Sequence, residues 1–219
     1  MPITFAKAPP ALADALCIHL RELLLVARVP PWVPVMRLED LTHTDPHPVF
    51  VVGLNDLVEG RLLSAAVQTG WRYLLVQDGV ATAEAELVPK RGRGAKAARV
   101  TDMQLAALTS GPFTEATIDA FRAAERLRPL QKENYEARFL KIPAVYFAAL
   151  WLHGASKDIL LPMVDPPGDL KANRPYSEAE VLDALRETAA QNKRFHDAHD
   201  KPRRTRGRSP DQGKQPASE

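Results

Sequence analysis

The chain has 219 residues, of which 45% are hydrophobic and 26% are charged, and its formal net charge at pH 7 is +2. These values are close to those of ordinary globular proteins and exclude a chain too short or too polar to bury a core. The charge is uneven, because residues 191–219 carry 8 basic and 4 acidic side chains whereas the rest carry 21 and 23. The sequence therefore predicts a nearly neutral folded body followed by a basic tail.

The N-terminal residues 1–10 (MPITFAKAPP) contain no basic segment of the kind that begins a signal peptide. Charged residues interrupt the apolar stretch that follows, so we expect a cytoplasmic protein without a membrane anchor. The single cysteine, Cys17, excludes an internal disulfide, and its position in an apolar helical pattern predicts a buried thiol. The abundance of alanine and arginine is typical of a GC-rich bacterial genome.

The first half of the chain alternates helical and strand patterns. Leucines recur every three or four residues over residues 11–28, which predicts a helix. The segment 32–48 is rich in proline and predicts an extended surface connection. A strand is expected over 47–53, and a helix from Asn55 or Asp56 to Thr69. The next strand, 71–77, would then lie parallel to the first, because a helical crossover joins parallel strands.

Asp78 and Gly79 form the strongest short hairpin signal in the sequence, since a type I′ turn requires a positive φ at both positions. They predict a hairpin between residues 71–77 and 80–87. Alanine and leucine alternate with polar residues in the second strand. We therefore expect Glu84 and Glu86 on a face that is open to water.

The second half of the chain predicts mainly helices. We expect a short helix over 101–108 and a longer one over 113–127 that Thr114 caps. The apolar stretch 143–152 has apolar residues nearly all round a helix and predicts a buried core helix.

A short strand over 158–163 is expected next, because this run is rich in large aliphatic residues. Ser177 and Glu180 have the spacing of a capping box and predict the start of the last helix. From His199 onward no large apolar residue occurs, so this segment cannot bury enough surface to fold alone.

Together these patterns predict the α+β class. We expect a single domain over residues 11–195, in which helices cover a short mixed β-sheet that includes the 71–77/80–87 hairpin. Residues 1–10 would be a flexible N-terminus, and residues 196–219 a disordered basic tail.

Glu84 and Glu86 are the catalytic candidates that the sequence offers. Alternate residues of a strand lie about 7 Å apart on one face, and two carboxylates at that distance can perform acid–base chemistry or hold a divalent cation. Arg72, Arg138 and Lys141 are cations that could complete such a site, and we choose Arg138 as the third candidate.

We expect no cofactor and no metal site. His43 and His47 have the spacing of a helical metal-binding pair, but Pro46 and Pro48 exclude a helix there. The sequence contains neither the G-x-S-x-G pattern of serine hydrolases nor the glycine-rich patterns of nucleotide-binding loops.

Two basic segments could bind anions or the phosphates of a nucleic acid without sequence specificity. The residues concerned are Lys90, Arg91, Arg93, Lys201, Arg203, Arg204, Arg206 and Arg208. No aromatic residue is interleaved with them, so stacking on bases is not indicated. We expect any such association to be weak.

The sequence leaves three hypotheses for the function. The first is a non-catalytic bacterial accessory protein that binds another protein, because a full-sized core comes without a catalytic motif and the basic tail suits an acidic partner. The second is an enzyme with an unrecognised site that uses Glu84 and Glu86. The third is weak nucleic-acid association through the basic loop and tail.

Overall fold

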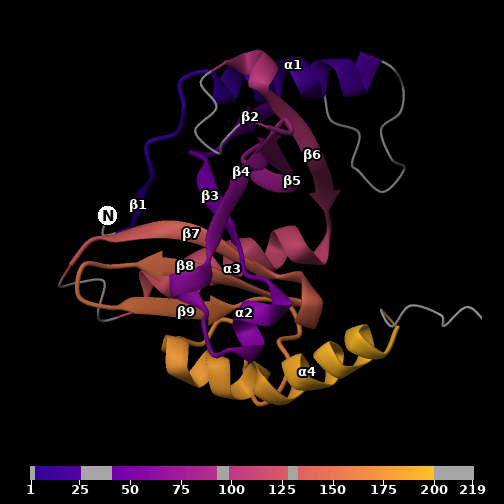
Figure 1. Ribbon diagram of the computed structural model, residues 1–219. Helices are drawn as coiled ribbons and strands as arrows, with labels where there is room; N and C mark the ends of the chain where they lie inside the picture. Colours follow the sequence, from indigo (N-terminus) through magenta and orange to yellow (C-terminus); the bar gives the residue numbers. More distant parts are fainter. Residues whose placement is uncertain (1–2, 26–40, 93–98, 128–132, 200–219) are drawn as a thin grey trace, which may run out of the picture.

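The computed structural model describes residues 3–25, 41–92, 99–127 and 133–199. In this part of the chain, one mixed sheet of nine strands carries α-helices on both faces (Figure 1). The strands are β1 Ile3–Phe5, β2 Leu41–His43, β3 His47–Val51, β4 Val67–Gln77, β5 Val80–Pro89, β6 Met103–Ser110, β7 Tyr135–Ile142, β8 Phe147–His153 and β9 Asp158–Pro162. The helices are α1 Leu12–Leu25, α2 Leu54–Val58, α3 Pro112–Glu125 and α4 Glu178–His199. The α+β class and the single mixed sheet are confirmed.

The strand order is β6-β5-β4-β3-β7-β8-β9, with β1 paired to β7 and β2 paired to β4. β7 pairs in parallel with β1 over its first residues and with β3 over its last, and the other strand pairs are antiparallel. Residues 3–5 of the expected flexible N-terminus thus extend the sheet as β1. The proline-rich connection expected over 32–48 was also partly wrong, because β2 and the start of β3 lie within it, while residues 32–40 are outside the described residues.

The hairpin between β4 and β5 is confirmed. Asp78 and Gly79 connect the strands with φ values of 52° and 78°, as a type I′ turn requires. Ala83, Ala85 and Leu87 are completely buried on the face that was expected to meet the core.

The predicted helix over 55–69 and the parallel pairing that depended on it were wrong. The helix α2 stops at Val58, and Gly60 adopts a positive φ of 76° just after it. The chain then turns back, and β4 begins at Val67, which pairs with Val51 in an antiparallel ladder. The pairing with β3 supplies backbone hydrogen bonds and burial that local helix propensity does not match.

The predicted core helix over 143–152 was also wrong. This stretch forms a 3₁₀ turn, Pro143–Val145, followed by β8, which lies between β7 and β9. Both faces of β8 are buried, and a strand covered on both faces has no polar side, so its sequence resembles that of a buried helix. The predicted strand at 158–163 is confirmed as β9.

The short helix expected over 101–108 is mostly strand, because β6 occupies Met103–Ser110 at the edge of the sheet. Only a 3₁₀ turn, Val100–Asp102, precedes it. β6 pairs with β5 along its whole length, so the ladder partner decides the conformation of this segment.

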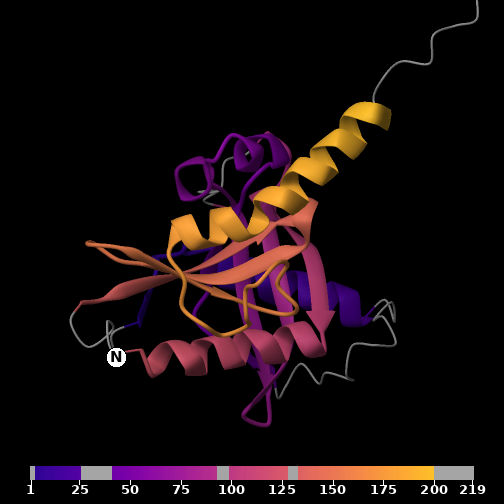
Figure 2. The same cartoon turned by 90° about the horizontal axis from the view of Figure 1, so that it is seen from below.

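The helices form three cores with the sheet. α1 packs on β4, β5 and β6, whereas α4 and α2 pack on the same face at the β7–β8–β9 end. α3 covers the opposite face, and Figure 2 shows α3 and α4 on either side of the sheet. The prediction of a buried thiol was wrong, because Cys17 is exposed on α1 beside buried Leu16.

The capping box of the last helix is confirmed. The backbone N–H of Ser177 donates to Glu180 Oε2 at 2.7 Å, and the N–H of Glu180 donates to Ser177 Oγ at 3.4 Å. α4 continues to His199, so residues 196–199, which were expected to be disordered, are helical, and residues 200–219 lie outside the described residues. None of the described helices combines the length and the apolar character needed to span a membrane.

Candidate functional site

A pocket of about 260 Å³ lies between the sheet and the beginning of α3. Side chains from β4, β5, β6, β7 and α3 line it: Arg72, Glu84, Glu86, Ala107, Thr109, Phe113, Phe139 and Lys141. Both glutamates that the sequence singled out are therefore in one pocket, together with two of the three cations that were considered beside them.

Strand register explains why these side chains converge. Arg72 is directly opposite Glu86 in the β4–β5 pair, and Glu84 precedes Glu86 by two residues, so all three project from the same face. That face is the one covered by α3. The expectation that Glu84 and Glu86 meet water was therefore wrong, since Glu84 is buried and Glu86 is largely covered.

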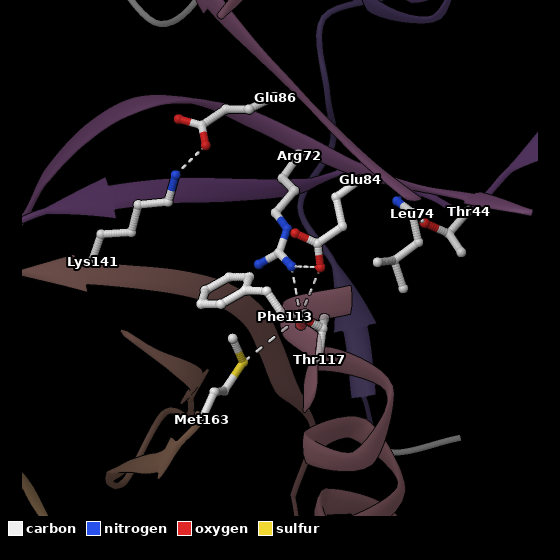
Figure 3. Close-up of polar contacts among 9 residues, drawn as sticks. All are labelled: Thr44, Arg72, Leu74, Glu84, Glu86, Phe113, Thr117, Lys141 and Met163. Atoms are coloured by element: carbon white, nitrogen blue, oxygen red, sulfur yellow. Dashed lines mark hydrogen bonds and ion pairs between the residues drawn. The ribbon is translucent and has the colours of Figure 1, made fainter. Parts of the chain in front are cut away.

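Arg72 and Glu84 form a buried ion pair at the base of the pocket (Figure 3). Their side chains are only 2% and 5% exposed. Thr117 of α3 joins the pair, because its hydroxyl accepts a hydrogen bond from Arg72 Nη2 at 2.5 Å and lies 2.9 Å from Glu84 Oε1, to which it can donate. A buried pair that is also hydrogen-bonded is costly to break, because either partner alone would be an uncompensated buried charge.

α3 places Phe113 and Thr117 one turn apart over the sheet. The helix begins after Gly111, which has a φ of 91°, and Pro112 occupies its first turn. The predicted helix is thus confirmed, but Thr114 is not its cap and is instead buried against the sheet. The sequence reasoning missed Thr117, although its position one turn after Phe113 on the same helix face was a usable signal.

The guanidinium of Arg72 has hydrogen-bond donors that the described residues do not use. Among the described residues, neither Nε nor Nη1 has a hydrogen-bond partner, although both atoms are buried. The group stacks on the ring of Phe139, with 3.9 Å from Cζ to the ring centroid. Burial lowers the pKa of Arg72 to about 9, against the opposing effect of Glu86, so the side chain is charged at neutral pH. Unsatisfied buried donors are rare in folded proteins and often mark a site that a ligand completes.

Lys141 and Glu86 form a second ion pair at the mouth of the pocket, where their side chains are 30% and 15% exposed. In Figure 3 they lie on the side of Arg72 that faces away from Thr117. Glu86 uses Oε2 for Lys141, and no described residue donates to its Oε1. The mouth of the pocket therefore offers an ammonium group and a free carboxylate oxygen close together.

Arg138, the third catalytic candidate, does not reach this pocket. It projects from the opposite face of β7, where Nε donates to Glu136 Oε1 at 2.7 Å and the guanidinium lies 4.7 Å from the Trp151 ring centroid. Successive side chains of a strand point to opposite faces, so β7 cannot present Arg138 and Lys141 on the same side.

His47 lies on β3 directly opposite Arg72 and is 1% exposed. Its ring packs edge-on against Phe121 and Phe139, and neither ring nitrogen has a hydrogen-bond partner among the described residues. Burial and, to a smaller extent, the charge of Arg72 lower the pKa of His47 from 6.5 to about 3. The imidazole is therefore neutral at physiological pH.

We expect His47 to make the folded state sensitive to acid. The unfolded imidazole binds a proton near pH 6.5 and the folded one only near pH 3. The free energy of unfolding should therefore be unaffected by His47 above pH 6.5 and fall below it by about 1.4 kcal/mol per pH unit. Urea denaturation of the wild type and of His47→Leu between pH 7 and 4 measures this, because other groups cancel in the difference. Parallel curves for the two proteins would contradict the prediction.

His43, the other member of the histidine pair, lies elsewhere, as does His153. His43 of β2 packs against Tyr73 on the α1 side of the sheet, with 4.9 Å between ring centroids. His153 of β8 contacts Asp158 through Nδ1 at 2.7 Å. Within the described ranges, no three His, Cys, Asp or Glu side chains are placed to hold a metal ion.

The residues proposed for nucleic-acid contacts are only partly described. Lys90 and Arg91 are exposed just after β5. Arg93 and the tail residues lie outside the described residues: Lys201, Arg203, Arg204, Arg206 and Arg208. The described part of this basic loop is not among the residues that line the pocket.

Comparison of the chain with protein-family models, with curated proteins and with solved structures found no match.

Proposed function

We propose that the protein binds a small polar molecule in the pocket between α3 and the sheet, through a hydrogen-bond acceptor on that molecule. The observation that carries this proposal is the guanidinium of Arg72, which is buried, charged and supplied with two nitrogens that no described residue engages. A carboxylate, phosphate or amide oxygen would satisfy these donors, and hydrogen bonds to a charged group are stronger than neutral ones.

The size of the pocket limits the ligand. Pockets for drug-sized molecules have volumes of roughly 300–1,000 Å³. The volume of about 260 Å³ lies just below that range. Its walls combine the rings of Phe113 and Phe139 with a few polar groups, which is typical of sites that bind small organic molecules.

A titration with small acceptor-bearing molecules tests the proposal. We expect isothermal titration calorimetry to detect saturable binding of at least one of inorganic phosphate, acetate, propionate, propionamide and alanine. A ligand present at 100 times its Kd should also raise the free energy of unfolding by about 2.7 kcal/mol. Absence of binding by all five probes would contradict the proposal.

Two substitutions on β6 separate binding in the pocket from binding elsewhere. Ala107 lines the pocket and Ala106, its neighbour, is exposed. Ala107→Leu should fill the pocket and abolish binding, whereas Ala106→Leu should leave the affinity unchanged. Equal effects of the two substitutions would show that the probes bind at another place.

The three hypotheses drawn from the sequence stay predictions. In the pocket Glu84 and Glu86 are each paired with a cation, which favours a role in binding over a role as a free acid or base. Protein binding and nucleic-acid association involve surfaces that the pocket does not include, so they are compatible with a small-molecule ligand.

A further inference from the structure

The charges around the pocket balance. Arg72 and Lys141 contribute two positive charges, and Glu84 and Glu86 contribute two negative ones, while the neighbouring His47 is neutral. Among the described residues, no other charged side chain lines the pocket. A ligand with a net charge would therefore leave one uncompensated charge beside the buried pair Arg72–Glu84, which is costly.

The polar groups that remain available to a ligand are hydrogen-bond donors on Arg72 and an acceptor on Glu86. The free nitrogens of Arg72 require an acceptor, whereas Oε1 of Glu86 requires a donor. Arg72 and Glu86 face each other across the β4–β5 pair. Directly opposed residues have Cβ atoms about 5 Å apart, so a small ligand that meets both needs its acceptor and its donor within a few bonds of each other.

Apart from Thr109, the remaining lining residues are apolar. Phe113 and Phe139 lie over the guanidinium of Arg72, with ring centroids 5.4 and 3.9 Å from Cζ, and Ala107 closes the side of β6. A further charged group on the ligand would have no oppositely charged partner there. A small hydrocarbon group would bury apolar surface instead, at about 25 cal/mol per Å².

We infer that the ligand is a zwitterionic α-amino acid with a small apolar side chain, bound with its carboxylate on Arg72 and Lys141 and its ammonium group on Glu86. This inference rests on the proposed function and names its ligand class. An α-amino acid with an apolar side chain is neutral overall, carries its ammonium and carboxylate groups on the same carbon and leaves one hydrocarbon group for the aromatic walls.

Three probes isolate the charge of the ligand: alanine, and propionate and ethylamine, each of which lacks one of the two charged groups of alanine. At pH 7 they are a zwitterion, an anion and a cation. We expect calorimetric titration of the wild type to give a Kd for alanine at least 10-fold lower than for either of the others. Aspartate and lysine, which add a charged side chain, should also bind at least 10-fold more weakly than alanine.

Changing the charge of the pocket should change the preferred probe. Glu86→Gln leaves the lining with a net positive charge, so propionate should become the tightest of the three. Lys141→Met leaves a net negative charge, so ethylamine should gain and alanine should lose at least 10-fold in affinity. Both residues are at the mouth of the pocket, and either variant alone tests the inference if the other does not fold.

Glu136→Gln is the matched control, because it removes a carboxylate from the opposite face of the sheet. It should leave the order of the three affinities unchanged. Two results would overturn the amino-acid inference but not the proposed function. One is tighter binding of propionate than of alanine to the wild type, and the other is an order of the three affinities that Glu86→Gln and Lys141→Met leave unaltered. Absence of binding by these probes and also by phosphate, acetate and propionamide would overturn the proposed function as well.

Discussion

Replacement of Arg72 by methionine is expected to lower the free energy of unfolding by about 3–5 kcal/mol, the range seen when one partner of a buried ion pair is removed. Methionine keeps an unbranched aliphatic stem, so the main loss is the charged guanidinium that stacks on Phe139 and pairs with Glu84. Glu84 would then be buried with only the hydroxyl of Thr117 beside it. Urea denaturation at pH 7 measures the effect.

The double variant Arg72→Met/Glu84→Leu separates the cost of an unpaired charge from the value of the pair. Replacing both partners by apolar residues of similar volume is often nearly neutral, so most of the lost stability should return. Ligand binding should not return, because the free donors of Arg72 are gone. A single variant within 1 kcal/mol of the wild type would show that the pair contributes little, and a double variant that still binds ligand would exclude Arg72 as the binding group.

Gly70→Ala is expected to lower the free energy of unfolding by about 3 kcal/mol, at the upper end of the usual range for overpacking. A Cβ at this position in β4 would lie 2.5 Å from the carbonyl oxygen of Leu87 and 3.0 Å from Val88 Cγ1. The clash with Leu87 is with backbone, so no side-chain rotation can relieve it. The β4–β5 ladder would have to shift, and Trp71 and Arg72, the next residues, would shift with it.

Gly79→Ala provides the matched control for this effect. Gly79 has a φ of 78° in the hairpin turn, but an added Cβ would meet no atom within 4 Å. Its cost is therefore conformational alone, about 1–2 kcal/mol for a residue in the left-handed region. Chemical denaturation of both variants should rank Gly70→Ala as clearly the more destabilised. A smaller loss for Gly70→Ala than for Gly79→Ala would contradict the steric argument.

The pocket depends on the arrangement of the whole sheet. Its base comes from the β4–β5 hairpin, one wall comes from β7, and its cover comes from α3. These elements are brought together by the antiparallel pairing of β3 with β4 and the parallel pairing of β3 with β7. The local sequence contains no information on which strands pair with β3 on either side. The sequence therefore indicated candidate residues of the site but not their arrangement in space.

The sequence by itself determined the features that depend on a few neighbouring residues. Asp78 and Gly79 specified the hairpin, because few residues tolerate a positive φ at two successive positions. Ser177 and Glu180 specified the start of α4, because both groups satisfy backbone N–H groups within one turn. The leucine periodicity likewise predicted the helix α1, and the succession of helix and strand patterns predicted the α+β class.

Only the tertiary structure decided the features that depend on what covers a segment. The stretch 143–152 is apolar on all sides, which a buried helix and a doubly covered strand share, and its neighbours β7 and β9 made most of it a strand. Glu84 and Glu86 alternate with alanine as on a water-facing strand, but α3 covers that face and Arg72 and Lys141 neutralise them. Arg138 was separated from them because β7 is a strand, in which residues 138 and 141 must point to opposite faces. The burial of a side chain and the pairing of a strand depend on contacts with distant parts of the chain. For that reason the sequence indicated several residues of the site, whereas the fold determined their burial and their charge partners.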